Sequence, residues 1–191
     1  MTGPRLHGTD GIRGRVDSHS GDDESALQAL IDQRILSSRA MRIIGEATGL
    51  FLVDDIGDSP LVLIGWDRRD GNPELVDALE SGLGAAGCRT MRIGEVPTPG
   101  IHHAVMTCAA DAGMMVTASH NPATDSGVKL FDAKGYKSMP ETEEKISQLA
   151  WGLADGSHAA PQECGDVLDE IDGLNLYRNA VQSRIVELES L

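Results

Sequence analysis

Aromatic and basic residues are scarce in this chain, and both shortages exclude classes of partner. Phe, Trp and Tyr make up 3% of the 191 residues, too few to form the stacking platform that binds single-stranded nucleic acid. The 16 Lys and Arg residues are outnumbered by 30 Asp and Glu residues, which gives a formal net charge of −14. Nucleic-acid phosphates and anionic membrane surfaces attract proteins of the opposite charge. We therefore expect no nucleic-acid partner and no membrane partner.

Cysteine and long hydrophobic runs are scarce as well. The three cysteines, Cys88, Cys108 and Cys164, are far apart and odd in number, which argues against a disulfide framework or a cysteine-based zinc site. No apolar run approaches the roughly 20 residues that span a bilayer, and residues 1–7 lack the apolar segment of a secretory signal. The sequence predicts a soluble, cytoplasmic protein, and its 40% hydrophobic content is typical of a globular one.

The hydrophobic pattern predicts alternating strands and helices. Apolar residues at three- and four-residue steps over 27–35 and 40–51 favour helices that are interrupted at Ser37-Ser38. The continuous apolar run 61–65 is typical of a buried parallel strand, and Asn72-Pro73 is suited to the cap and first position of a helix. Residues 1–21 are expected to be loop with little strand. Further strands are expected at 89–93, 113–117 and 128–131, and further helices at 101–110, from Pro140 and at 174–188. This alternation predicts a three-layer α/β/α domain with a mostly parallel mixed sheet.

The segment Thr117-Ala118-Ser119-His120-Asn121-Pro122 is the strongest local signal for chemistry. It follows an apolar strand directly, and ligands of open α/β sheets bind at this end of the strands. His120 could orient groups around the Ser119 oxygen. Lys129, on the next expected strand, could bring a positive charge back to the same place. The alternative is a polar turn with a solvated lysine.

Two further loops predict a local anion pocket in this acidic protein. Gly8-Thr9-Asp10-Gly11-Ile12-Arg13-Gly14 combines three glycines with an arginine, which suits the close approach of an anion. Gly65-Trp66-Asp67-Arg68-Arg69-Asp70-Gly71 places two arginines at the edge of the sheet where Ser119 is expected. An ordinary turn and surface ion pairing are the respective alternatives.

Two motif matches do not predict function here. Residues 82–87 match the dinucleotide pattern G-x-G-x-x-G, but they fall late in an expected helix rather than at its start. Ser126 and Lys129 match S-x-x-K, but the partner motifs of penicillin-recognising enzymes are absent from the sequence. We therefore expect neither NAD or FAD binding nor this type of hydrolase.

Taken together, the motifs are similar in order and rough spacing to those of the α-D-phosphohexomutases over about residues 5–150. The matching segments are Gly8–Gly14, Val96–Pro99, Thr117–Pro122 and Gly127–Lys129. The resemblance implies that Ser119 carries a phosphoryl group, which passes to a hexose monophosphate and gives a bisphosphorylated sugar. Its catalytic residues would be Ser119, His120, Lys129 and Arg13, and its substrate or phosphate ligands Thr9, Asn121 and Arg69.

The same resemblance implies the cofactors and the substrate class. Mg²⁺ would bind Ser119 through its phosphate, and a hexose 1,6-bisphosphate would act as activator. Asp10 in the opening motif is most similar to the phosphoglucosamine mutase branch, which favours glucosamine phosphate. Thr117 is also common in phosphomannomutase/phosphoglucomutase relatives, so that branch is the alternative.

The family has four domains, and this sequence corresponds to little more than the first. We expect residues 1–152 to form the phosphoserine domain and residues 153–191 to be a linker and helix that lead to a missing second domain. The remaining Mg²⁺ ligands would lie in the missing part, so the chain is expected to be an inactive fragment by itself. A non-catalytic short protein that binds phosphosugars or a partner is the alternative, and the oligomeric state is left open.

Overall fold

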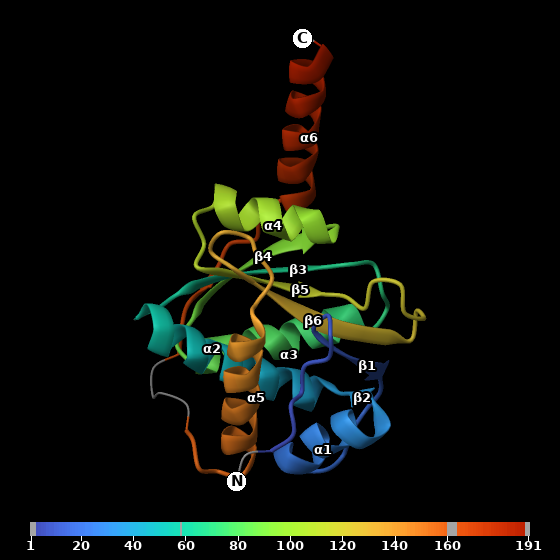
Figure 1. The fold of residues 1–191 in the computed structure, drawn as a ribbon, viewed down its shortest axis with the longest axis vertical. Coiled ribbons are helices and arrows are strands. Elements are labelled where there is room, and N and C mark those ends of the chain that lie inside the picture. The colour runs from blue at the N-terminus through green and yellow to red at the C-terminus, as the bar shows by residue number, and fades with distance from the viewer. Residues whose placement is uncertain (1–2, 58, 160–163, 190–191) are drawn as a thin grey trace.

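A seven-stranded sheet forms the centre of the residues that the computed structural model describes, which are 3–57, 59–159 and 164–189 (Figure 1). The strand order is β2-β1-β6-β5-β3-β4-β7. β6 runs antiparallel to both of its neighbours, and every other pair is parallel. The strands are β1 (Ile12–Val16), β2 (Ile35–Leu36), β3 (Leu61–Trp66), β4 (Arg89–Glu95), β5 (Ala112–Val116), β6 (Asp125–Asp132) and β7 (Val167–Leu168). The predicted mostly parallel mixed sheet is confirmed.

Helices cover both faces of the sheet, as the predicted three-layer α/β/α architecture requires. α1, α2, α3 and α5 lie on one face and α4 lies on the other (Figure 1). β5 is buried at every position because it is covered on both faces. The helices are α1 (Asp23–Gln33), α2 (Ser38–Ile56), α3 (Asn72–Ala85), α4 (Thr98–Thr107), α5 (Pro140–Ala154) and α6 (Gly173–Glu189).

Local sequence sets several of these boundaries. The Asp22 carboxylate accepts from the Ser25 N–H at 2.9 Å and caps α1, and the Ser37 hydroxyl accepts from the Ala40 N–H at 3.2 Å and caps α2. Gly87 follows α3 with a φ of +92°, the left-handed conformation expected after a helix end. The predicted interruption at Ser37-Ser38 and the helix start at Pro140 are confirmed.

Three expectations differ from the structure. Residues 1–21 contain β1, whose Ile12 is fully buried beside Val128 of β6. The helix expected at 101–110 begins earlier, at Thr98, because a proline is tolerated in the first helical turn. The predicted cap at Asn72 is wrong, because Gly71 is the cap residue of α3 and Asn72 is a fully buried helical residue.

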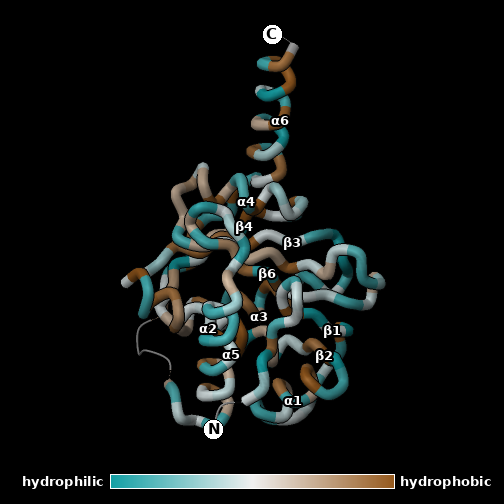
Figure 2. Tube along the Cα trace, viewed as in Figure 1, coloured by the Kyte–Doolittle hydropathy of each residue, from teal (hydrophilic) through white to brown (hydrophobic). Residues whose placement is uncertain are grey.

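The C-terminal helix α6 projects away from the rest of the fold (Figure 1). Its first turns contact α4 and β4. There Leu176 packs against the smaller of two hydrophobic cores, the smaller core, which includes Ile93 and Ile101. Hydrophobic residues continue along the projecting part, and residues 181–188 are all exposed (Figure 2). Of residues 153–191, expected to be a linker and helix, residues 160–163 and 190–191 lie outside the described residues. No helix in the described part of the chain is long and apolar enough to cross a membrane.

Candidate functional site

Ser119 lies in the loop that follows β5, in an unusual backbone conformation. Its φ is +55°, in the left-handed region that residues other than glycine rarely adopt. The Ser119 N–H donates to the Thr117 hydroxyl at 2.9 Å, and the Thr117 hydroxyl donates to the Asp67 carboxylate at 2.6 Å. The loop after β3 therefore fixes the loop after β5.

Arg69 holds the serine loop from the same side. Its side chain is 11% exposed, and its guanidinium contacts Asp67 at 3.1 Å. The other donors reach main-chain carbonyl oxygens of Ser119, Asn121, Pro122 and Asp125 at 2.6–3.3 Å. In contrast, the Arg68 side chain is 90% exposed and pairs with Glu95. Of the two predicted arginines, only Arg69 contacts the serine loop.

Asn72 is part of this scaffold, although its sequence context indicated only a helix cap. Its amide donates to the Asp67 carboxylate at 2.7 Å and to the Val116 carbonyl at 3.2 Å, and its Oδ1 accepts from the Ser126 hydroxyl at 2.5 Å. It thereby links β3, β5 and β6 beneath the loop. Nothing in the local pattern indicates this role, because Asn-Pro at the start of a helix is typical of capping.

Two predicted cations lie beside Ser119 and its loop. Lys129 Nζ, on β6, donates to Ser119 Oγ at 3.1 Å. Arg13, on β1, donates to Asn121 Oδ1 at 3.2 Å. The antiparallel pairing of β1 and β6 sets these two residues near each other, with Arg13 directly opposite Gly127. The structure therefore brings together Ser119, Asn121, Lys129 and Arg13, as predicted from their separate motifs.

Asp10 lies between the two cations. Its Oδ2 is 2.9 Å from Lys129 Nζ, the same carboxylate pairs with Arg13, and its Oδ1 is 3.6 Å from Lys137 Nζ. Partial burial raises the pKa of Asp10, but the hydrogen bond from Lys129 and the neighbouring positive charges outweigh this effect and lower the pKa. Asp10 is therefore ionised at neutral pH. It was not among the site residues predicted from the sequence.

The side chains of the remaining predicted residues, His120 and Thr9, make no hydrogen bond with Ser119 in the described structure. His120 is exposed, and among the described residues its side chain has no hydrogen-bond partner. Thr9 is exposed, and its carbonyl accepts from Lys137 Nζ at 2.8 Å. The basic residues that flank the opening motif face other partners, since Arg5 pairs with Glu143 and Arg15 with Asp17.

The segment before Gly8 is attached to α5. The Trp151 indole donates to the Pro4 carbonyl at 2.7 Å, and the Leu6 N–H donates to the Ser147 hydroxyl at 3.1 Å. His7 lies beside Ser147, and burial lowers its pKa to about 4, although the nearby Glu143 charge acts in the opposite direction. These contacts fix the start of the loop that carries Asp10 and Arg13.

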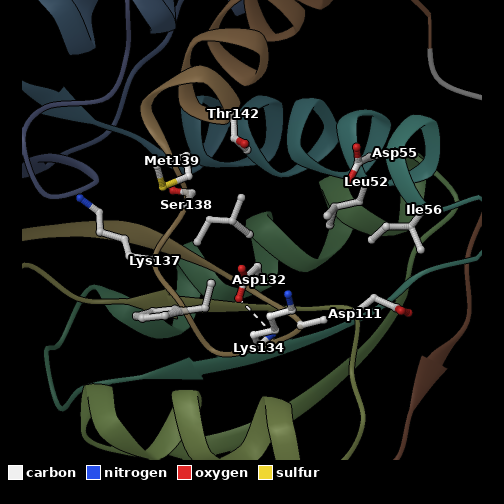
Figure 3. Close-up of a pocket in the computed structure, with 13 residues that line it drawn as sticks. Leu52, Asp55, Ile56, Asp111, Asp132, Lys134, Lys137, Ser138, Met139 and Thr142 are labelled. Atoms are coloured by element: carbon white, nitrogen blue, oxygen red, sulfur yellow. Dashed lines mark hydrogen bonds between the residues drawn. The ribbon is translucent and has the colours of Figure 1, made fainter.

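The described residues do not form a metal site of their own. Within them, no group of three or more His, Cys, Asp or Glu side chains could hold an ion. The carboxylates of Asp67 and Asp10, which contact Thr117 and Lys129 beside Ser119, are both engaged with protein donors. A cavity of about 260 Å³, drawn in Figure 3, lies instead by Asp111 at the other end of β5. It is therefore separate from the serine loop.

The geometry agrees with comparisons to known proteins. Residues 4–154 match the family described as phosphoglucomutase/phosphomannomutase, alpha/beta/alpha domain I. The chain belongs to this family, the phosphohexomutases, and contains its N-terminal α/β/α domain. The resemblance found in the motifs is thus confirmed.

Individual relatives support the assignment. The chain is 34% identical over 173 residues to the phosphoglucosamine mutase of Paracoccus denitrificans, covering 91% of this chain and 35% of that protein. It is 40% identical over 146 residues to that of Xanthomonas oryzae pv. oryzae, covering 76% and 29%. A phosphoglucomutase/phosphomannomutase family protein of Burkholderia thailandensis superposes with a TM-score of 0.65 at 26% identity, covering 90% of this chain and 34% of that one. The chain spans about a third of the length of these relatives.

Proposed function

We propose that the chain is the phosphoserine-bearing N-terminal domain of a phosphohexomutase, an enzyme that moves a phosphoryl group between the 1 and 6 positions of a hexose phosphate. The observation that carries this proposal is the contact of 3.1 Å between Lys129 Nζ and Ser119 Oγ, at a serine held in the left-handed conformation. A hydroxyl at the end of a strand, presented beside a cation, is suited to accept and release a dianionic group.

Ser119 would transfer the phosphoryl group, and Lys129 would move the proton. In transfer to the sugar, the bond from phosphorus to Ser119 Oγ breaks as a sugar hydroxyl oxygen bonds to phosphorus. The Lys129 ammonium, the donor in contact, gives a proton to the departing Ser119 Oγ, and the neutral amine that remains takes up the proton that the sugar hydroxyl loses. The reverse transfer from the bisphosphorylated sugar regenerates the phosphoserine.

The other predicted residues would bind or orient the phosphoryl group. Arg13 supplies a fixed positive charge, and its Nε is the one buried side-chain polar atom without a partner in the described part of the chain. The side chain of Asn121 is oriented by its hydrogen bond from Arg13. The exposed side chains of His120 and Thr9, each in a loop at this site, would contact the phosphoryl group or the substrate. Arg69, whose donors reach carbonyl groups, would act by positioning the serine loop.

The cofactors follow from the family rather than from this chain alone. Mg²⁺ would bind an oxygen of the Ser119 phosphate. Its other ligands would come from outside these residues, since the nearby carboxylates of Asp67 and Asp10 already contact protein donors. A hexose 1,6-bisphosphate would supply the phosphoryl group to Ser119. Glucosamine phosphate is the favoured substrate because the Paracoccus and Xanthomonas relatives are phosphoglucosamine mutases. The alternative is a phosphomannomutase/phosphoglucomutase.

We further propose that the phosphoserine domain is residues 1–152 and that residues 153–191 lead to a second domain. Two observations support this division. The family match stops at residue 154, whereas the Paracoccus relative aligns over 173 residues. The exposed apolar residues of α6 would be covered by such a domain.

The test is uptake of phosphate by Ser119, separated from turnover. The purified chain is incubated with glucose 1,6-bisphosphate, and the intact mass is expected to rise by about 80 Da at Ser119 and to return after phosphatase treatment. A Ser119→Ala chain is the control and should stay unchanged. Turnover of glucosamine 6-phosphate is expected to be absent from this chain alone. Failure of Ser119 to take up phosphate from any hexose 1,6-bisphosphate would favour a non-catalytic, phosphosugar-binding protein.

A further inference from the structure

A negative charge, the Asp10 carboxylate, lies inside the cationic cluster that a phosphate group would need. Asp10 Oδ2 and Ser119 Oγ contact the same Lys129 ammonium, at 2.9 and 3.1 Å. The carboxylate also pairs with Arg13. A phosphate on Ser119 would bring a second, larger negative charge to cations that Asp10 already neutralises.

We propose that Asp10 is a removable counter-ion of the phosphate site: it neutralises Lys129 and Arg13 while Ser119 is free, and it turns to Lys137 when a phosphate group arrives. This inference rests on the proposed function, because it takes the Ser119 site as one that binds phosphate. A phosphate dianion carries about twice the charge of a carboxylate, so it displaces Asp10 rather than the reverse. In the free site, Asp10 offsets the repulsion between two partly buried cations.

Lys137 is the position to which Asp10 can turn. Its Nζ is 3.6 Å from Asp10 Oδ1, longer than a hydrogen bond, so the contact can shorten when Oδ2 releases Lys129. Lys137 is held nearby by the Thr9 carbonyl at 2.8 Å and by the buried Glu143 carboxylate at 3.8 Å. Its ammonium therefore stays at the loop whichever partner Asp10 contacts.

The Asp10 side chain has solvent on one side into which it can turn. It is 45% exposed, and it lies in a loop in which Gly11 has a φ of +86°. Lys129, in contrast, is 11% exposed and extends from a strand paired on both sides. The carboxylate is thus the mobile member of this ion pair, and the ammonium is the fixed one.

The test measures the affinity of the full 191-residue chain for inorganic phosphate by titration calorimetry at low ionic strength. Asp10→Asn is expected to bind phosphate about fivefold more tightly, the upper range for removing a competing, partly exposed charge. Asp10→Glu keeps the charge and is expected to bind like the unaltered chain. Asp54→Asn removes an exposed carboxylate on the distant part of α2, and its affinity should change less than about twofold. The thermal midpoint of each variant checks that it is folded.

A double-mutant cycle tests the role of Lys137. Lys137→Met is expected to weaken phosphate binding in the unaltered chain, because Asp10 then stays on Lys129, and to have no effect in the Asp10→Asn background. An equal loss in both backgrounds would show that Lys137 acts on phosphate directly and would overturn the exchange. Weaker or unchanged binding by a folded Asp10→Asn chain would overturn the counter-ion role while leaving the phosphate site intact. If no chain bound phosphate and Ser119 took up none, the proposed function would fail together with this inference.

Discussion

Arg69 acts on the main chain rather than on a ligand in this structure. Its donors reach carbonyl groups of the serine loop, and its only acidic partner among the described residues is Asp67. A guanidinium is suited to this task because its donors have a fixed planar arrangement and stay charged. The loop conformation at Ser119 therefore depends on one side chain from the neighbouring loop.

Replacement of Arg69 by Met is expected to lower the free energy of unfolding by about 3 kcal/mol, because several mostly part-buried carbonyl groups lose a charged donor. Phosphate uptake by Ser119 should fall with it, since the serine loop loses its attachment. Arg68→Met is the matched control, and its effect should stay within about 0.5 kcal/mol because Arg68 is almost fully exposed. Urea unfolding of both variants makes the comparison, and equal stability losses would contradict a loop-holding role.

His7 gives the chain a defined pH dependence. Its pKa is lowered to about 4 by burial, whereas an unfolded histidine titrates near about 6.5. Between these values the unfolded state binds more protons, so stability is complete above the unfolded pKa and is lost as pH falls toward 4. The loss amounts to about 3 kcal/mol.

His7→Gln is expected to remove most of this slope between pH 7 and pH 4. His120→Gln is the control, because His120 is exposed and its removal should leave the slope as it is. Urea unfolding across this range of pH measures both. A slope that persists in His7→Gln would mean that other groups dominate the acid sensitivity.

At the scale of elements, glycines set how closely α2 and α3 approach. A Cβ on Gly82 would lie 2.0 Å from the Arg42 carbonyl oxygen, and one on Gly45 would lie 2.4 Å from the Leu79 carbonyl oxygen. These contacts are with backbone atoms, which cannot move aside without separating the helices. Gly82 therefore serves helix packing, and Gly87 serves the turn after α3.

Gly82→Ala is expected to destabilise the chain by about 2 kcal/mol or more, because overpacking outweighs the helix propensity that alanine adds. Gly84→Ala lies in the same helix, where the new Cβ would have 4.0 Å of space, and it is expected to be neutral or stabilising by up to about 1 kcal/mol. Thermal unfolding distinguishes them. Similar changes in both variants would indicate that helix propensity, rather than close packing, decides stability here.

The elements that could be predicted from sequence are those with long periodic or continuous apolar patterns. α2, α3, β3 and β5 follow directly from such patterns. The two-residue strands β2 and β7 are too short to carry a pattern, and β1 alternates with glycine and arginine, so its pairing with β6 decides its conformation. The site residues divide in a similar way. Ser119 and Lys129 could be predicted because they lie in recognisable local motifs, whereas Asp10 and Asn72 acquire their roles from tertiary contacts that the local sequence does not show.

At the scale of the whole molecule, most of α6 lies outside the packed fold. Leu176 and Tyr177 make contacts with the smaller core and with His103. Beyond them the exposed apolar residues include Val181, Ile185, Val186 and Leu188. An exposed apolar stripe of this kind adds nothing to the stability of the chain and favours association.

Removal of residues 180–191 is therefore expected to leave the free energy of unfolding unchanged within about 0.5 kcal/mol. A chain ending at residue 172 loses Leu176 and Tyr177 as well and should be less stable by about 2 kcal/mol.

Sedimentation at increasing concentration is expected to show association of the full chain that weakens in a Val181→Gln/Ile185→Gln variant. A Gln182→Ala/Ser183→Ala variant of the same helix should associate as before. A large stability loss on removing residues 180–191 would instead place the whole of α6 within the cooperative unit, and the boundary proposed near residue 152 would have to move beyond it.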